Sequence, residues 1–176
     1  MTIECPTLEL VYYDVPKVAC TSLKTLFWEI NHDRPFRRPF LRTLESQVLW
    51  RLNVALPVVH RAEGYLTTSF AASGARPQGY ESFVVVRDPI ARLRSAWRDK
   101  VSKKAFGEHD ELDEMRNELL PSHPDLGTFI NYFDEYRQIS KPARQHTREL
   151  TWHLGPDLAV HDHVFRMEEL PGPSPT

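Results

Sequence analysis

The strongest constraint on the fold is a short, unbroken apolar run at residues 82–86, SFVVV. A turn-rich segment, 74–79, precedes this run, and Pro89 follows it. Such a run is typical of a strand that is covered on both faces, as in a parallel sheet. Pro89 is also well placed to open a helix, which we expect at residues 90–104.

A second strand-loop-helix unit is predicted near the N-terminus. Residues 8–15, LELVYYDV, form a β-rich run that stops at Pro16, and apolar residues at three- and four-residue spacing then predict a helix at 22–30. Thr21 and Ser22 are the candidates to cap that helix. Two such units predict an α/β fold with a central, mainly parallel sheet flanked by helices, whose ligand lies beyond the carboxyl ends of the strands.

The rest of the chain is less informative about the fold. With 176 residues and 41% hydrophobic content, one ordinary core is expected, and therefore one domain at residues 1–170. The proline-rich tail, 171–176, is expected to be disordered. The remaining expected elements are helices at 40–56, 62–73 and 126–136, an acidic surface segment at 108–118, and a late strand at 163–167.

Charge and cysteine content limit the function classes. The formal net charge is -2 and the pI is about 6.4, so nothing favours nucleic acid or an anionic membrane as the main partner. The two cysteines, Cys5 and Cys20, do not form a disulfide framework. No signal-peptide pattern and no run near the ~20 apolar residues of a membrane span is present in the sequence. A cytoplasmic location is the expectation.

The first loop, residues 16–22, has the composition of an anion site. Its sequence, PKVACTS, places Lys17, small residues and two hydroxyls between a strand end and a helix start. Backbone N–H groups at a helix start are unpaired, and the helix dipole favours negative charge there. A phosphate or sulfate would therefore suit this loop. It is not a Walker A loop, because it lacks glycines and its lysine comes before the turn.

The second motif, RDPIARLRSAW at residues 87–97, occupies the other strand-to-helix junction. Arg87 at the strand end and Ser95 on the helix can meet on one phosphate, because a guanidinium binds two oxygens and a serine hydroxyl a third. The plain alternative for the pair of motifs is a helix-capping loop and a salt-bridged strand end.

Together the two motifs resemble the phosphosulfate-binding and 3′-phosphate-binding motifs of the sulfotransferases that use 3′-phosphoadenosine 5′-phosphosulfate (PAPS), in particular the carbohydrate sulfotransferase branch. The resemblance spans residues 15–95, with a fainter similarity at 164–170, VFRMEEL. It implies a P-loop-like fold, PAPS as sulfuryl donor, no metal, and a hydroxyl acceptor. A carbohydrate is the favoured acceptor, and the hydroxyl of a protein tyrosine, a lipid or a small molecule is the open alternative. Leu23 departs from an aromatic residue often found there. Family members usually continue well beyond Leu170, so the chain is expected to be either a short member or incomplete.

The resemblance also implies roles for individual residues. Arg87 and Ser95 would hold the 3′-phosphate, and Lys17 would in addition stabilise the leaving oxygen. The 5′-phosphosulfate would be held by the loop, that is by Lys17, by the backbone of Val18, Ala19, Cys20, Thr21 and Ser22, and by the last two hydroxyls.

Sulfuryl transfer also needs a base for the acceptor hydroxyl. His60 is the favoured candidate, because it lies between the motifs and just before the helix expected at 62–73, where many members of the family place a histidine base. Arg61 is a candidate to bind the donor or an anionic acceptor, and Glu63 is the reserve base. The alternative is that His60 only caps or packs against that helix.

Two other groups of residues invite chemical interpretations. Cys20 at a helix start, near Lys17, would have a lowered pKa and act as a nucleophile, but a small residue packing under the loop is the favoured interpretation. His161 and His163 flank Asp162 and are candidate metal ligands, although surface or rim positions are favoured and no metal is expected.

Two rival functions remain at this stage. A P-loop-like kinase would need an acidic Mg²⁺ ligand at a strand end. A non-catalytic nucleotide-binding or interaction module derived from a sulfotransferase would keep Arg87 and Ser95 and dispense with His60.

Overall fold

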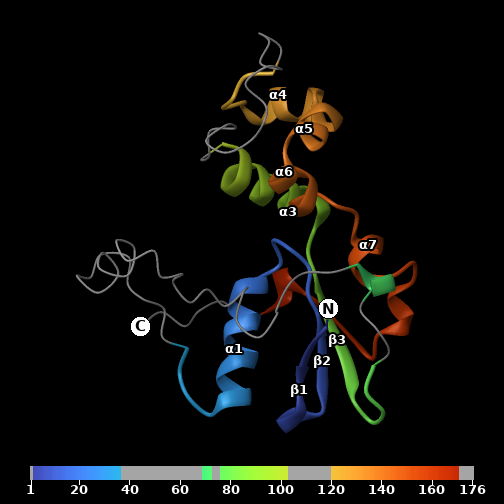
Figure 1. Ribbon diagram of the computed structural model, residues 1–176. Coiled ribbons are helices and arrows are strands. Elements are labelled where there is room, and N and C mark those ends of the chain that lie inside the picture. The colour runs from blue at the N-terminus through green and yellow to red at the C-terminus, as the bar shows by residue number, and fades with distance from the viewer. Residues whose placement is uncertain (1, 37–68, 73–75, 103–119, 171–176) are drawn as a thin grey trace, which may run out of the picture.

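The computed structural model describes residues 2–36, 69–72, 76–102 and 120–170. In this part of the chain four strands form one sheet in the order β1-β2-β3-β4 (Figure 1). The β1–β2 pair is antiparallel, and the β2–β3 and β3–β4 pairs are parallel. The strands are β1 Ile3–Cys5, β2 Leu10–Tyr13, β3 Glu81–Val86 and β4 His163–Arg166.

The mainly parallel α/β sheet predicted from the sequence is confirmed, including the late strand. Strand β1 was missed, because three residues ending before Pro6 carry too little periodicity to predict a strand. The strand expected at 8–15 is shorter than predicted. Pro6–Leu8 forms a 3-10 turn instead, and Glu9 follows it with a left-handed φ of 51°, which reverses the chain before β2.

Helices cover both faces of the sheet and one end of it. Figure 1 shows α1 along one side of the sheet, α7 on the other, and α3 to α6 gathered beyond the carboxyl end of β3. The helices are α1 Cys20–His32, α3 Pro89–Ala96, α4 Leu126–Asn131, α5 Phe133–Ile139, α6 Lys141–His146 and α7 Leu150–Leu154. None of the helices in the described ranges is long and apolar enough to cross a membrane.

The side chains of β2 alternate between the two faces of the sheet, and each face packs against its own layer of helices. The ring of Tyr12 stacks on Phe27 of α1, with ring centroids 5.9 Å apart, and on Phe83 of β3 at 5.1 Å. Val11 and Tyr13 project from the opposite face, where they belong to a buried cluster with Leu154 of α7. Successive side chains of a strand point to opposite faces, so β2 is buried on both.

A third buried cluster holds α4 to α6 against the end of α3. It contains Val101, Phe129, Tyr136 and Ala143. The helix predicted at 126–136 is interrupted at Tyr132, whose φ of -117° and ψ of 40° are not helical, and this bend lets α5 turn towards α6.

The helix predicted at 90–104 also departs from regularity. After α3 the chain continues as a π-helical turn, Trp97–Val101, in which Ser102 N donates to Trp97 O at 2.8 Å. Such turns are uncommon and shift the side chains that follow by about one position around the helix.

Several sequence predictions fall outside the described residues. These are the helix at 40–56, the acidic segment at 108–118, the tail at 171–176, and the helix at 62–73 except for a 3-10 turn, Phe70–Ala72.

Candidate functional site

The loop between β2 and α1 has a sharply bent backbone. Helix α1 begins at Cys20, and its N-cap is Ala19. The prediction that Thr21 or Ser22 caps this helix is therefore wrong. Ala19 has a φ of 62° and Lys17 a φ of 71°. Left-handed conformations cost non-glycine residues about 1–2 kcal/mol. No described side chain caps this helix end, so its first N–H groups are open to an anionic ligand.

A buried ion pair joins the two ends of this loop. Lys24 Nζ of α1 lies 2.6 Å from Asp14 Oδ2, one residue after β2, and each side chain is only 1% exposed. Charges at this depth are stable only when paired, because burial removes them from water. The pair therefore ties the start of α1 to the end of β2.

Arg92 of α3 binds the backbone of this loop, a role that was not predicted from the sequence. Its side chain is largely buried, Nε donates to Pro16 O at 3.0 Å, and Nη1 donates to Arg148 O at 2.7 Å. Burial lowers the pKa of this guanidinium, and Glu149 partly opposes that effect. Arg92 is thus a positioning residue that connects the loop to the segment before α7.

The end of β3 meets the same loop. Arg87 Nη1 donates to Lys17 O at 3.2 Å, so the two sequence motifs are in direct contact. Asp88 caps α3 by accepting from Ala91 N at 2.7 Å, and Pro89 opens the helix as predicted. Glu168, from the late segment, accepts from Asp88 N at 3.1 Å and lies 4.0 Å from Arg87 Nε.

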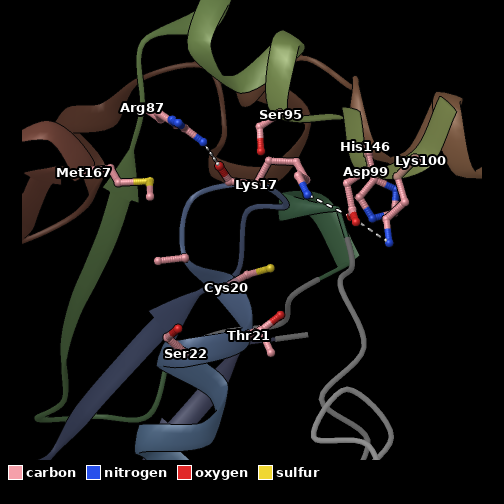
Figure 2. A pocket seen from close by; sticks show the side chains of 11 residues that line it. Lys17, Cys20, Thr21, Ser22, Arg87, Ser95, Asp99, Lys100, His146 and Met167 are labelled. Atoms are coloured by element: carbon pink, nitrogen blue, oxygen red, sulfur yellow. Dashed lines mark hydrogen bonds and ion pairs between the residues drawn. The ribbon is translucent and has the colours of Figure 1, made fainter. Parts of the chain in front are cut away.

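These elements enclose a pocket of about 230 Å³. Figure 2 shows Lys17 in its middle, Arg87 and Ser95 on one side, and Thr21 and Ser22 at the start of α1 on the other. The pocket is lined by Lys17, Ala19, Cys20, Thr21, Ser22, Arg87, Ser95, Asp99, Lys100, His146 and Met167. Of the binding residues predicted within the two motifs, Val18 alone is not in the lining, because its side chain is fully buried in the core.

A second pocket of about 210 Å³ adjoins the first and shares Arg87 and Ser95 with it. It also contains Arg94 and Arg98, so its lining is strongly cationic. Arg87 and Ser95 therefore stand at the junction of two cavities, one reaching the loop and the other running along α3.

Lys17 is engaged by a carboxylate that sequence reasoning missed. Lys17 Nζ lies 2.9 Å from Asp99 Oδ2, and Lys100 Nζ lies 3.1 Å from the same oxygen. Burial alone would raise the pKa of Asp99, but hydrogen bonds from the two lysines outweigh it and lower the pKa to about 2. A usable signal existed, because Asp99 follows Ser95 by four residues and so lies on the same side of a helix.

Cys20 does not have the properties of a nucleophile. Burial raises the pKa of its thiol, the negative charge of Asp14 raises it further, and the backbone of Lys17 opposes this only in part. The lowered pKa expected from the helix start is therefore wrong. A neutral thiol fits the favoured interpretation, a small residue packed under the loop.

His161 and His163 make structural contacts at the sheet. His161 is buried and donates from Nε2 to a backbone carbonyl of α7, while His163 pairs with Glu81 at 2.8 Å. Asp162 accepts from the backbone and hydroxyl of Ser82, which lower its pKa to about 2. Within the described ranges, no group of three or more His, Cys, Asp or Glu side chains is arranged to hold a metal ion.

The bases predicted from the sequence belong to a segment that the structure does not describe. His60, Arg61 and Glu63 fall outside the described residues. The assignment of His60 as base therefore stays a prediction.

The fold is that of an α/β protein, and its pocket has the features of a phosphate-binding site. Cationic side chains and an uncapped helix N-terminus meet there beyond the carboxyl ends of parallel strands. Residues 1–171 match the sulfotransferase family, and the chain belongs to that family.

Two curated relatives illustrate the similarity. Carbohydrate sulfotransferase 11 of Rattus norvegicus is 32% identical over 102 residues, which cover 54% of this chain and 25% of that protein. Carbohydrate sulfotransferase 12 of Xenopus laevis is 23% identical over 184 residues, which cover 92% of this chain and 43% of that protein. The chain thus spans less than half the length of either relative. No solved structure matches it.

Proposed function

We propose that this protein transfers a sulfuryl group from PAPS to a hydroxyl of a carbohydrate. The observation that carries the proposal is the meeting of the two motifs at one pocket, with Arg87 Nη1 3.2 Å from Lys17 O. Membership of the sulfotransferase family supports the reaction class. The carbohydrate acceptor is supported by the names of the relatives.

The two adjoining pockets suit a ligand with anionic groups at both ends. At the loop, the Lys17 ammonium, the N–H groups at the start of α1 and the hydroxyls of Thr21 and Ser22 would bind the phosphosulfate. At the strand end, Arg87 and Ser95 would bind the 3′-phosphate. PAPS carries these two anionic groups on one ribose.

Lys17 has the central electrostatic role in this proposal. Transfer breaks the bond between sulfur and the bridging phosphate oxygen, and the Lys17 ammonium stabilises the charge left on that oxygen. In the structure this ammonium is held by Asp99, which also has Lys100 as a partner. Lys17 can therefore turn to an incoming anion while Asp99 keeps one cationic partner.

The structure gives the kinase alternative little support. A kinase would need a carboxylate at a strand end for Mg²⁺. Asp14, after β2, forms the buried pair with Lys24. Asp88, after β3, caps α3. Both of these carboxylates are thus already committed to structural contacts.

Calorimetric binding of 3′-phosphoadenosine 5′-phosphate (PAP), the spent donor, tests the proposal against ADP, ATP and AMP. We expect PAP to bind most tightly, and Arg87→Ala to weaken PAP about 10- to 100-fold while changing ADP far less, because ADP lacks the 3′-phosphate. Lys17→Ala should weaken both. Arg34→Ala is the matched control, since it removes the same charge from an exposed position near the far end of α1.

Equal binding of PAP and ADP by the folded protein would contradict the assigned donor. If PAP is preferred, transfer of radiolabelled sulfate from PAPS to a panel of polysaccharides tests the reaction itself. Preferred binding of PAP with no transfer to any acceptor would instead favour the non-catalytic module.

A further inference from the structure

His146 lies in the pocket although it is distant in sequence from both motifs. It is the last residue of α6 and lines the same cavity as Lys17 and Ser95. Figure 2 shows its ring beside Asp99 and Lys100, on the side of the pocket towards which the Lys17 side chain points. The ring therefore stands where the phosphosulfate end of the proposed donor would be.

The tautomer of His146 is fixed by its backbone contact. Nδ1 lies 2.8 Å from Pro142 O, and because a carbonyl oxygen can only accept, Nδ1 carries the proton. Among the described residues, no hydrogen-bond partner of Nε2 is found. In the neutral ring, Nε2 consequently has a lone pair that is available to a ligand.

Helix α6 holds this ring firmly. Ser140 caps the helix by accepting from Ala143 N at 3.1 Å, and Ala143 itself is buried in the cluster with Phe129 and Tyr136. A base must be held at hydrogen-bond distance from the proton that it takes, and an anchored short helix provides such a position.

The ring is neutral at physiological pH. Burial lowers the pKa of His146 to about 4, the contact with Pro142 opposes this, Lys100 and Lys17 lower it further, and Asp99 raises it. A neutral imidazole is the form that accepts a proton. An anionic donor bound at Lys17 would offset the lysine charges and raise the proton affinity of the ring when transfer occurs.

We propose that Nε2 of His146 is the base that takes the proton from the acceptor hydroxyl, an assignment that rests on the sulfuryl transfer proposed above. The acceptor oxygen forms its bond to sulfur, and the electron pair of its O–H bond stays on that oxygen. The proton passes to Nε2, which gives an imidazolium. The bond from sulfur to the bridging oxygen breaks, and its electron pair stays on the phosphate beside Lys17. The ring later returns its proton to water.

The variant His146→Asn isolates the proposed role. An asparagine amide keeps an N–H donor for Pro142 O but has nothing in place of the Nε2 lone pair. We expect the single-turnover rate at saturating PAPS to fall about 10²- to 10⁴-fold, while PAP affinity changes less than about twofold. His123→Asn, at an exposed histidine outside the pocket, is the matched control and should leave both quantities unchanged.

Chemical rescue separates a base from a structural residue. In His146→Ala, added imidazole should restore part of the transfer rate, with a pH dependence that follows the imidazole, because the small base can enter the space left by the side chain. His60→Asn, measured in parallel, compares the two candidate bases, because only the variant that lacks the base should lose a transfer rate that imidazole restores in the matching alanine variant. Circular dichroism confirms that each variant is folded.

Each outcome decides between alternatives. Loss of transfer with intact PAP binding and rescue by imidazole supports the assignment. Unchanged transfer in His146→Asn, loss confined to His60→Asn, or joint loss of PAP binding and transfer without rescue would each overturn it. If the wild-type protein does not bind PAP, the proposed function fails first, and this outcome is distinct from the others.

Discussion

The two walls of the pocket are built in different ways. In the loop wall, residues 14–24, the paired side chains of Asp14 and Lys24 are each 1% exposed, and the side chain of Val18 lies in the core. Two residues of this wall have a left-handed backbone conformation. The helix wall, residues 87–100, carries its charges nearer the surface, except for the largely buried Arg92, and the side chain of Asp99 is 47% exposed. The buried pair of the loop wall fixes the path of the backbone, whereas Lys17 can exchange its partner Asp99 in the helix wall for a ligand.

Burial explains this difference. A buried charge that loses its partner cannot be compensated by water, whereas an exposed one can. Substitutions of the buried pair Asp14–Lys24 should therefore change stability, and substitutions of the more exposed charges around the pocket, Lys17 included, should change ligand affinity.

The largest effect is expected from Lys24→Met. Removing the ammonium leaves Asp14 charged in an apolar site, and the free energy of unfolding should fall by about 3–5 kcal/mol. Lys100→Met in the helix wall should cost less than about 1 kcal/mol. Urea denaturation monitored by fluorescence measures both.

The double variant Asp14→Leu with Lys24→Met is the control, and it should recover most of the loss because no unpaired charge remains. A cost for Lys24→Met as small as that of Lys100→Met would remove the distinction between the walls.

A second effect depends on pH and involves two histidines, His153 and His146. Burial lowers the pKa of His153 to about 4, helped by Arg92, and burial likewise lowers that of His146 to about 4. An unfolded histidine titrates near 6.5, so the unfolded chain binds more protons between pH 6.5 and 4. Stability is full above pH 6.5 and should fall by about 2 kcal/mol per histidine between pH 7 and pH 5.

His153→Leu checks this expectation. The His153 side chain is only 2% exposed, and neither of its ring nitrogens has a hydrogen-bond partner among the described residues. Leucine should therefore be tolerated at pH 7 and should halve the loss measured at pH 5 by denaturant titration. An identical pH dependence in the variant would show that His153 is not the titrating group.

The smallest effect is expected from Asp99→Asn. Lys17 would lose its carboxylate partner and be freed for the ligand, so PAP affinity should rise about 3- to 10-fold with unfolding free energy within about 0.5 kcal/mol of wild type. Because the pKa of Asp99 is about 2, the difference should not vary between pH 5 and pH 8. Calorimetry across this range measures it. A lowered affinity would mean that Asp99 instead holds Lys17 in its binding position.

Local sequence signals account for much of the fold and the donor site. The apolar run in β3 and the Pro89 helix start are read from neighbouring residues, and both are present in the structure. Arg87 and Lys17 could be expected together, because the carboxyl ends of adjacent parallel strands meet at one edge of the sheet.

What the sequence did not reveal depends on contacts between distant segments. Lys17 and Asp99 are 82 residues apart, and although the spacing from Ser95 indicates on which side of the helix Asp99 lies, no local pattern pairs it with Lys17. His146 is one of eight histidines, and only the packing of α6 brings it to the pocket. The interruption at Tyr132 likewise follows from the docking of α5, because the apolar spacing of residues 126–136 fits one continuous helix.

The position of β4 late in the sequence determines when the sheet can be completed during synthesis. Strand β4 pairs with β3, and its neighbour Glu168 contacts Asp88, which precedes it by 80 residues. A chain emerging from the ribosome would present β3 with one unpaired edge until β4 arrives, and such an edge attracts other strands. Parallel pairing of strands that are far apart in the sequence is also slow to form. Newly made protein should therefore be most prone to aggregation just before β4 is synthesised, and it should gain its binding pocket only afterwards.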